Sequence, residues 1–259
     1  KAPSESVVET PWSVSTSTPK PRNNLPAQLT TFIGRENEIR EIKKAINNYR
    51  LVTLTGSGGT GKTRLSLKVA EALLKQFDYI WFVELAPISD PENIPQTILS
   101  ALGLSEQPGK TVLELIREYL YDKSTLIILD NCEHLLEASA KISYSLLNHA
   151  SELKVLASSR EALGVKGEMA WHVPSLSLPD INHLPELDEI VKYEAIRLFT
   201  ERATLAQPNF TLTKETAPSI AQICSRLDGI PLAIELAAAR IKAFSVEQIA
   251  ARLDDRFRL

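Results

Sequence analysis

The feature that most constrains this chain is the run GSGGTGKT at positions 56–63. It matches the pattern GxxxxGK[ST], and it lies between an apolar stretch, residues 51–55, and a segment of helical spacing that begins near Lys62. Glycines allow positive φ angles, so successive N–H groups can converge on an anion, and a helix N-terminus adds partial positive charge there. The sequence therefore predicts a strand, a phosphate-binding loop (P-loop) and a helix, in that order.

The end of this loop carries two side chains with separate predicted roles. Lys62 would reach the β and γ oxygens of a nucleotide, and the Thr63 hydroxyl would be one ligand of Mg²⁺. The remaining predicted contacts come from the loop itself and from the residue after it: Gly56, Ser57, Gly58, Gly59, Thr60, Gly61 and Arg64. An ordinary glycine-rich turn is the alternative, but a chance match is on the order of one in a hundred for a chain of this length. We therefore expect a nucleoside triphosphate, or the diphosphate left from it, with Mg²⁺.

Short apolar runs separated by helical patterns predict the fold class. They lie at residues 51–55, 79–85, 125–130 and 154–159, with a further short one at 170–173. Strands that are nearly apolar throughout and alternate with helices are typical of a parallel sheet covered on both faces. The prediction is an α/β fold, a P-loop NTPase with a doubly wound parallel sheet, followed by a small all-helical domain.

The domain organisation follows from composition and periodicity. Residues 1–25 are rich in Ser, Thr and Pro without apolar periodicity, which indicates a linker to a neighbouring domain. Residues 26–180 are predicted to form the nucleotide-binding α/β domain. After a Pro-containing stretch, every periodic segment is helical, so residues 181–259 are predicted to form the helical domain. The chain begins with Lys1, and both ends are expected to be cuts in a longer protein.

Composition narrows the setting in which such a chain would work. Hydrophobic residues make up 44% and charged residues 24%, and the longest apolar run contains Glu235, so we expect a cytoplasmic protein with no membrane segment. The net charge of −3 offers no footprint for nucleic acid, so any contact with DNA is expected through another domain of the parent protein. Cys132 and Cys224 show no metal-ligand spacing and are interpreted as buried free thiols.

A carboxylate ends the apolar run at 126–129. Asp130 at this position is predicted to hold Mg²⁺ directly or through water, although strand-end aspartates also cap turns. The next residue, Asn131, cannot accept a proton from an attacking water. Glu133 is a candidate for that role, but it is equally explained as a first-turn helix residue favoured by the dipole. Both interpretations stay open, so fast hydrolysis is not implied.

An arginine follows the next predicted strand. Arg160 would lie at the edge of the sheet where open α/β proteins bind ligands, and there it could contact a γ-phosphate and sense its loss. The alternative is a surface arginine that pairs with Glu161 or with solvent.

Several motifs occur in an order that resembles a known family. These are FIGRENE at 32–38, the P-loop, LDNCEH at 129–134, SSRE at 158–161 and GIPLAIELAAAR at 229–240. Over about residues 25–259 the chain is similar to the NB-ARC or AP-ATPase branch of the STAND NTPases, and most similar to its bacterial regulators. The resemblance implies that Phe32, Ile33, Gly34 and Arg35 lie beside the adenine, that Arg160 is the first sensor, and that Pro231 and its neighbour Leu232 pack against the base from the helical domain. From the residues alone, Pro231 is simply the first residue of a helix after a glycine turn.

The resemblance also implies a mode of action. ADP would lock a closed state, and exchange for ATP would permit opening and self-association through the nucleotide-binding module, with slow Mg²⁺-dependent hydrolysis. The partners would be further copies of the module and the sensor and effector domains of the same parent chain. A winged-helix domain that contributes a histidine usually follows at about the point where this chain ends. The four histidines present match no such position and are interpreted as structural or exposed: His134, His149, His172 and His183.

Two other classes of function compete with a switch in a signalling or transcription regulator. A catalytic P-loop enzyme such as a phosphotransferase would need an acceptor pocket and an arginine-bearing lid, and no segment between Ser159 and Leu259 resembles either. A passive scaffold that keeps nucleotide for stability stays open because of Asn131.

Overall fold

Five parallel strands form the centre of the first part of the chain. The computed structural model describes residues 22–257, so most of the predicted linker at 1–25 lies outside the described residues. The strands are β1 (Leu51–Thr55), β2 (Tyr79–Glu84), β3 (Thr125–Asp130), β4 (Leu153–Ser158) and β5 (Glu168–His172). Their order across the sheet is β2-β3-β4-β1-β5, and every neighbouring pair is parallel. Parallel neighbours need crossover connections, which the intervening helices supply.

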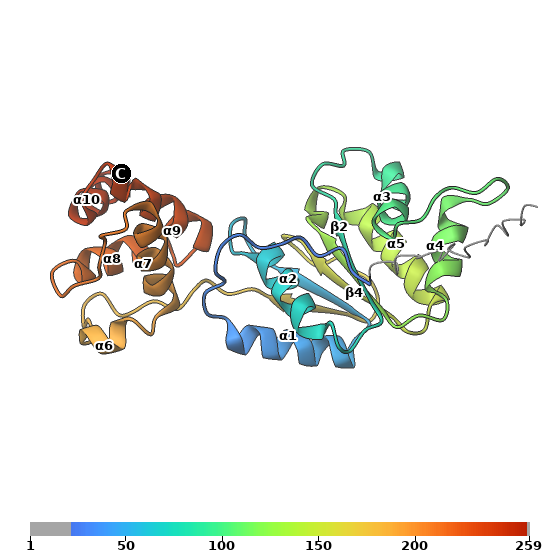
Figure 1. The fold of residues 1–259 in the computed structure, drawn as a ribbon, viewed down its shortest axis with the longest axis horizontal. Helices are drawn as coiled ribbons and strands as arrows, with labels where there is room; N and C mark the ends of the chain where they lie inside the picture. The colour runs from blue at the N-terminus through green and yellow to red at the C-terminus, as the bar shows by residue number, and fades with distance from the viewer. Residues whose placement is uncertain (1–21, 258–259) are drawn as a thin grey trace, which may run out of the picture.

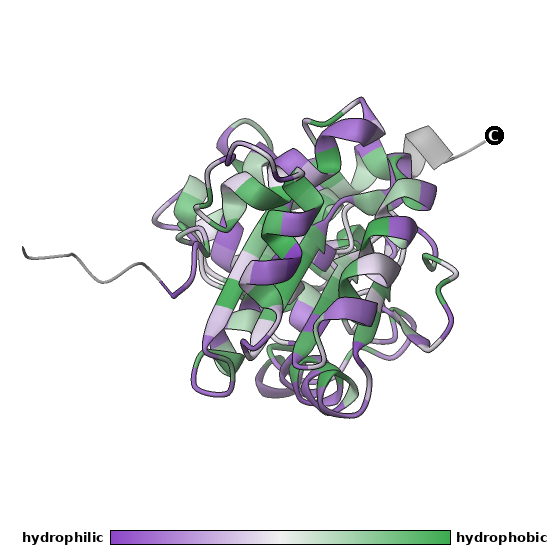
Figure 2. Ribbon diagram, turned by 90° about the vertical axis from the view of Figure 1, so that its right-hand side faces the viewer, coloured by the Kyte–Doolittle hydropathy of each residue, from purple (hydrophilic) through white to green (hydrophobic). Residues whose placement is uncertain are grey.

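Helices cover both faces of this sheet because successive side chains of a strand point to opposite faces. On one face Ile80, Ile128 and Leu156 pack with helices α1 (Glu36–Asn48) and α2 (Lys62–Leu73). On the other face Trp81 and Ile127 pack with the remaining helices of this part. These are α3 (Ile94–Ala101), α4 (Val112–Leu120) and α5 (Leu136–His149). Figure 2 shows green strands behind helices that carry both green and purple segments. The predicted doubly wound α/β fold is confirmed.

The strand ends differ from the prediction by one or two residues. Strand β4 ends at Ser158, so Ser159 and Arg160 lie beyond it, and β5 begins at Glu168, two residues before the predicted start. Such shifts are expected because a sequence pattern marks the apolar centre of a strand better than its last hydrogen bond.

The second part of the described chain contains helices and no strand. It comprises α6 (Leu187–Ile190), α7 (Glu194–Ala206), α8 (Ala217–Arg226), α9 (Pro231–Ala238), the 3-10 turn η3 (Ala239–Lys242) and α10 (Val246–Phe257). Short 3-10 turns η1 (Pro91–Asn93) and η2 (Cys132–His134) occur in the first part. Figure 1 shows the helical part beside the sheet, at the end where α2 begins. Its core includes Leu176, four residues before the predicted boundary at 180–181, which stays a prediction.

Three further expectations concern the two cysteines, the four histidines and a membrane segment. Cys132 and Cys224 are buried and unpaired, and burial raises the pKa of each thiol to about 12. All four histidines are exposed. Of the helices in residues 22–257, none combines the length and the apolar character that crossing a bilayer demands.

A glycine between α8 and α9 joins the helical part to the segment that leaves the sheet. Gly229 has φ +66° and its carbonyl accepts from the Leu176 N–H at 3.0 Å, and a Cβ there would lie 2.5 Å from the Leu176 oxygen. Gly103, after α3, has nearly the same φ of +67° but open space around it. Both glycines therefore need a positive φ, but only Gly229 has neighbouring atoms that a Cβ would collide with.

We expect Gly103→Ala to lower the free energy of unfolding by about 1–2 kcal/mol, because only the left-handed backbone is strained. Gly229→Ala should cost about 1–3 kcal/mol more, because the Cβ also displaces the Leu176 backbone. Urea unfolding of both variants measures the difference. Equal losses would show that the contact with Leu176 is not a constraint on the fold.

Candidate functional site

The P-loop connects the end of β1 to the start of α2. Gly59 and Gly61 have φ values of +81° and +86°, which a residue with a Cβ rarely adopts. Gly59 is also crowded, because an added Cβ would lie 3.0 Å from Cβ of Leu232 in the helical part. The loop is thus both shaped for inward-facing N–H groups and closely covered by another part of the chain.

The ammonium group of Lys62 lies back over the loop. It donates to the carbonyl oxygens of Gly56 at 2.8 Å and Ser57 at 3.0 Å. Burial lowers the pKa of Lys62 below its ordinary value, while nearby Glu133 and Asp130 favour the charged form. Its two hydrogen bonds hold the Lys62 side chain at the loop, which is where its predicted role would place it.

A chain of hydrogen bonds links α2 to β3 and β4. The Thr63 hydroxyl donates to the two carboxylate oxygens of Asp130 at 2.8 and 2.9 Å, and the Ser158 hydroxyl donates to one of them at 2.5 Å. Burial raises the pKa of Asp130, and the hydrogen bonds from Ser158 and Thr63 oppose that rise. The hydroxyl and the carboxylate are the oxygen ligands that Mg²⁺ prefers, so this pair suits the predicted metal. No group of three or more His, Cys, Asp or Glu gathers as a metal cluster among the residues that the structure describes.

The residues predicted to act on water or on a γ-phosphate lie beyond this pair. Asn131 adopts φ +65°, and its N–H donates to the Ser158 hydroxyl at 2.9 Å. Glu133 lines the cleft described below, and its Oε2 is buried without a hydrogen-bond partner within the described part of the chain. Its other oxygen pairs with the Arg160 guanidinium at 3.5 Å. The Arg160 side chain is 70% exposed and does not line the cleft; its partner is Glu133, not Glu161.

The turn predicted to lie beside the base is tied to the P-loop by Arg35. This residue has φ +64° and is 3% exposed, and its guanidinium donates to the Thr60 carbonyl at 2.9 Å. The same nitrogen donates to the Pro174 carbonyl at 2.9 Å, while Nη1 is buried without a partner among residues 22–257. Burial lowers the pKa of Arg35, and Glu38 and Glu194 oppose this. An unpartnered buried donor is suited to an acceptor on a bound molecule.

Two cavities hold most of the predicted site residues. A small one of about 30 Å³, on the Arg35 side, is lined by residues that include Phe32, Ile33, Arg35, Thr60, Gly61, Arg64 and Pro231. A cleft of about 280 Å³, on the Thr63 side, is lined by Gly58, Gly59, Gly61, Lys62, Thr63, Arg64, Asn131, Glu133, Ser158, Pro231, Leu232 and Glu235. The smaller cavity has room for about one water molecule, so a base would require it to widen. Gly34 lines neither cavity, because it packs against Glu194 of α7.

The start of α9, in the helical part, lines the cleft opposite residues of the P-loop. Pro231 and Leu232 begin α9, and the Leu232 N–H donates to the Gly59 carbonyl at 3.2 Å. The first turn of a helix has N–H groups with no partner in the helix, so this donor is free for such a contact. The cleft is therefore formed jointly by the P-loop and α9.

Sequence reasoning missed three residues that organise this region. Ser158 contacts both Asp130 and the Asn131 backbone, and Glu194 accepts from the Arg35 N–H at 2.6 Å. Glu235 lines both cavities. Its position as the one carboxylate in an apolar run was a signal that could have found it, because a charged group there needs a partner.

Comparisons with known proteins find a domain family, relatives and solved structures that are similar to this chain. Residues 46–165 match the family model described as an AAA domain. An uncharacterized protein of Mycobacterium tuberculosis is 41% identical over 232 residues, which are 89% of this chain and 56% of that protein. A candidate HTH-type transcriptional regulator of the same organism is 45% identical over 210 residues, which are 81% of this chain and 22% of the regulator. The chain thus spans about half the length of one relative and about a fifth of the other.

Two solved structures share the fold. A Signal Transduction ATPase with Numerous Domains (STAND) protein with a tetratricopeptide repeat sensor, from Pyrococcus horikoshii, has a TM-score of 0.52 at 17% identity. The match covers 91% of this chain and 34% of that one. AMPPCP-bound DnaA from Aquifex aeolicus has a TM-score of 0.51 at 16% identity, over 87% of this chain and 68% of that one. At such identities the likeness concerns the fold alone.

The Ser158 hydroxyl provides a test of how the cleft is built. We expect Ser158→Ala to lower the free energy of unfolding by about 1–3 kcal/mol, because the Asn131 N–H and the Asp130 carboxylate each lose a buried partner. Ser143→Ala in α5 is the matched control, since its hydroxyl is buried without a hydrogen-bond partner in the described chain. Chemical denaturation should show a neutral or stabilising effect for the control. A Ser158 variant as stable as the control would contradict the organising role of this hydroxyl.

Proposed function

We propose that the AAA-type P-loop NTPase domain of this chain works as an ATP/ADP-binding switch module in a multidomain signalling or transcription regulator. ADP favours a closed arrangement of the α/β and helical parts. Exchange for ATP favours an open arrangement that self-associates through the same module. Hydrolysis is slow and returns the module to the closed state.

The observation that carries this proposal is the joint construction of the cleft. Gly59 of the P-loop and Leu232 of α9 are hydrogen bonded, and both line the space beside Lys62 and Thr63. A nucleotide in that space would contact both parts of the chain. A ligand shifts a conformational equilibrium only through its different affinities for the two states, and contacts with both parts provide such a difference.

Within the proposal, each residue around the loop has a part in binding. The P-loop N–H groups and Lys62 hold the phosphates, and Thr63 and Asp130 hold Mg²⁺ together with phosphate oxygens and water. When bound, Mg²⁺ neutralises phosphate charge. Arg35, through its unpartnered Nη1, is a donor to the base or ribose, with Phe32 and Ile33 as apolar neighbours.

Slow hydrolysis is supported by the surroundings of Asn131 and Glu133. Asn131 has no proton-accepting oxygen of carboxylate basicity, and Glu133 is engaged by Arg160. One of the two Glu133 oxygens is thus paired with Arg160, and only the buried Oε2 is without a partner in the described part of the chain. Such surroundings favour slow hydrolysis, so that a bound ATP would persist for a long time before it is converted to ADP.

The wider role is supported by the relatives. One is a candidate HTH-type transcriptional regulator that extends well beyond the matched region, and one structural neighbour is a signal-transduction ATPase with a sensor domain. Another neighbour was solved with AMPPCP bound. Sensor and effector domains of the same parent chain are the proposed partners, contact with DNA is assigned to such a domain, and the proposed location is the cytoplasm.

A metal-dependent loss of affinity tests the role of Asp130. We expect Asp130→Asn to weaken ADP binding with Mg²⁺ on the order of tenfold, and to change metal-free binding much less, because the carboxylate acts through the ion. Titration of ADP with Mg²⁺ and with a chelator measures both affinities. An equal loss in the two conditions would make Asp130 a structural residue.

The switch itself is tested by the difference between ATP and ADP. We expect Arg160→Ala to narrow the ratio of the two affinities by about fivefold or more, because Arg160 is proposed to respond to the γ-phosphate. Pro231→Ala should weaken both nucleotides by similar factors, because Pro231 packs in either state. Calorimetric titration of both nucleotides into both variants gives the four affinities.

Lys62→Ala is the reference without nucleotide binding for these titrations. If the Arg160 variant lost ADP and ATP affinity by the same factor, Arg160 would not respond to the γ-phosphate. If ADP and ATP bound equally well to the unaltered protein, the result would favour a passive scaffold over a switch.

A further inference from the structure

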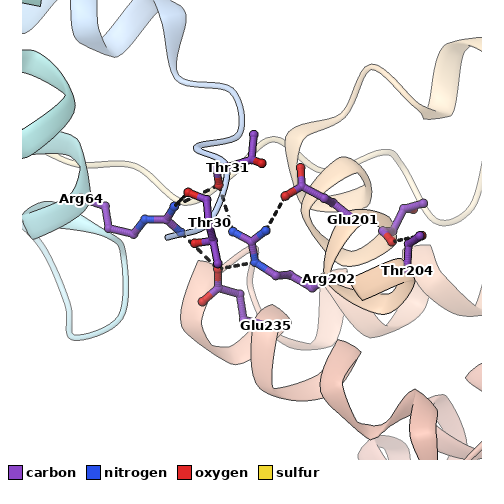
Figure 3. Close-up of polar contacts among 8 residues, drawn as sticks. Thr30, Thr31, Arg64, Glu201, Arg202, Thr204 and Glu235 are labelled. Atoms are coloured by element: carbon purple, nitrogen blue, oxygen red, sulfur yellow. Dashed lines mark hydrogen bonds and ion pairs between the residues drawn. The ribbon is translucent and has the colours of Figure 1, made fainter. Parts of the chain in front are cut away.

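Three segments that lie far apart in the sequence meet around one carboxylate, that of Glu235 (Figure 3). Its Oε1 accepts a hydrogen bond from Nε of Arg202 in α7 at 2.9 Å. The same oxygen accepts from Nη1 of Arg64 in α2 at 3.3 Å. Two guanidinium groups from different parts of the molecule therefore share one negative charge.

The two arginines also share a backbone carbonyl in the segment before α1. Arg64 donates to the carbonyl oxygens of Thr30 and Thr31, both at 3.0 Å. Arg202 donates to the Thr31 carbonyl at 3.0 Å. The chain before α1 is thereby held between α2 and α7, as Figure 3 shows.

The contacts divide into those within the helical part and those that cross to the α/β part. Arg202 is 10% exposed and also pairs with Glu201 at 2.5 Å, so Glu201, Arg202 and Glu235 form a set within the helical part. Arg64 is the cation that reaches this set from the P-loop helix. Its side chain and that of Glu235 are each 29% exposed, so water screens their attraction only in part.

The contact between Arg64 and Glu235 joins residues that lie next to the P-loop and to the first turn of α9. Arg64 directly follows Thr63, and Glu235 lies one helical turn after Pro231 and near Leu232 on α9. A bond between Arg64 and Glu235 therefore fixes the first turn of α9 relative to the P-loop. The hydrogen bond between Leu232 and Gly59 lies within the region that this bond holds together.

We propose that Arg64, Glu235 and Arg202 form a clasp that holds the helical part against the P-loop in the absence of nucleotide. Arg202 positions the Glu235 carboxylate, and Arg64 engages it across the junction. The clasp consists of contacts within the protein and requires no nucleotide. Only its role in setting the closed state of the switch rests on the proposed function. Opening of the two parts requires the bond between Arg64 and Glu235 to break.

The distance between two spin labels in nucleotide-free protein tests the clasp. Labels at Asn48→Cys, the last residue of α1, and Lys242→Cys in η3 report on the two parts, and both positions are exposed. Cys132 and Cys224 are each 0% exposed, so the added cysteines label selectively. The unaltered clasp should give one dominant distance. Glu235→Gln should raise the ratio of open to closed molecules on the order of 3- to 10-fold, because glutamine still accepts from Arg202 but lacks the charge that Arg64 engages.

A second variant and a matched control keep the test decisive. Arg64→Gln should open the molecule to a similar extent from the α/β side, and the double variant should open it no further than either single change. Glu201→Gln removes a carboxylate from Arg202 within one helix and should leave the distances unchanged. Unchanged distances in both the Arg64 and the Glu235 variants would overturn the clasp, and so would an equal opening in the Glu201 control.

Addition of ADP separates this inference from the proposed function. ADP should return the Glu235 variant toward the shorter distance if the nucleotide also closes the molecule. Failure of ADP to bind or to close any variant would contradict the switch. The distances measured without nucleotide would test the clasp whether or not ADP closes the molecule.

Discussion

The parallel pairing of β4 with β1 on one side and β3 on the other is the constraint on which the site depends. Parallel strands in register bring their carboxyl ends to one edge, so the P-loop after β1, Asp130 at the end of β3 and Ser158 at the end of β4 lie together. The hydrogen bonds among Thr63, Asp130 and Ser158 follow from this order. An interchange of β4 with β5 would separate Ser158 from Asp130 without changing any residue.

The helical part is attached to this edge by contacts of a different character. Its own core is apolar, but its links to the α/β part are polar. The Arg35 N–H donates to the Glu194 carboxylate, and the Leu232 N–H donates to the Gly59 carbonyl. Arg64 and Glu235 form an ion pair. Polar links between parts of a chain are individually weak and can be exchanged for water, so relative motion is the ordinary expectation for such a junction. Under the switch proposal, a nucleotide at the same junction would add its binding free energy to a small free-energy difference between the two arrangements.

The sequence was a good guide to the sheet and a partial guide to the site. The strand-loop-helix pattern around Gly56 and the carboxylate after residues 126–129 were readable because each is local, and local patterns carry their own geometry. Ser158, Arg202 and Glu235 were not readable as a group. The contacts of Ser158 with Asp130, of Arg202 with Glu235 and of Arg202 with Thr31 span 28, 33 and 171 positions, and they depend on how the sheet and the helices assemble. Arg160 shows the same limit, since no pattern in the sequence indicated that Glu133 would be its partner. The predicted roles of the site residues remain predictions.

The charges at the junction suggest why two nucleotides would affect it differently under the switch proposal. Arg64 and Glu235 both line the cleft beside Lys62, so a bound phosphate chain adds negative charge close to both. Negative charge attracts Arg64 and repels Glu235, and each effect weakens the bond between them. The extra γ-phosphate of ATP increases that charge, and Coulomb interactions at a partly desolvated site are stronger than those in bulk water. ADP would leave the Arg64–Glu235 bond more nearly intact, and so the closed arrangement would be the one that ADP favours.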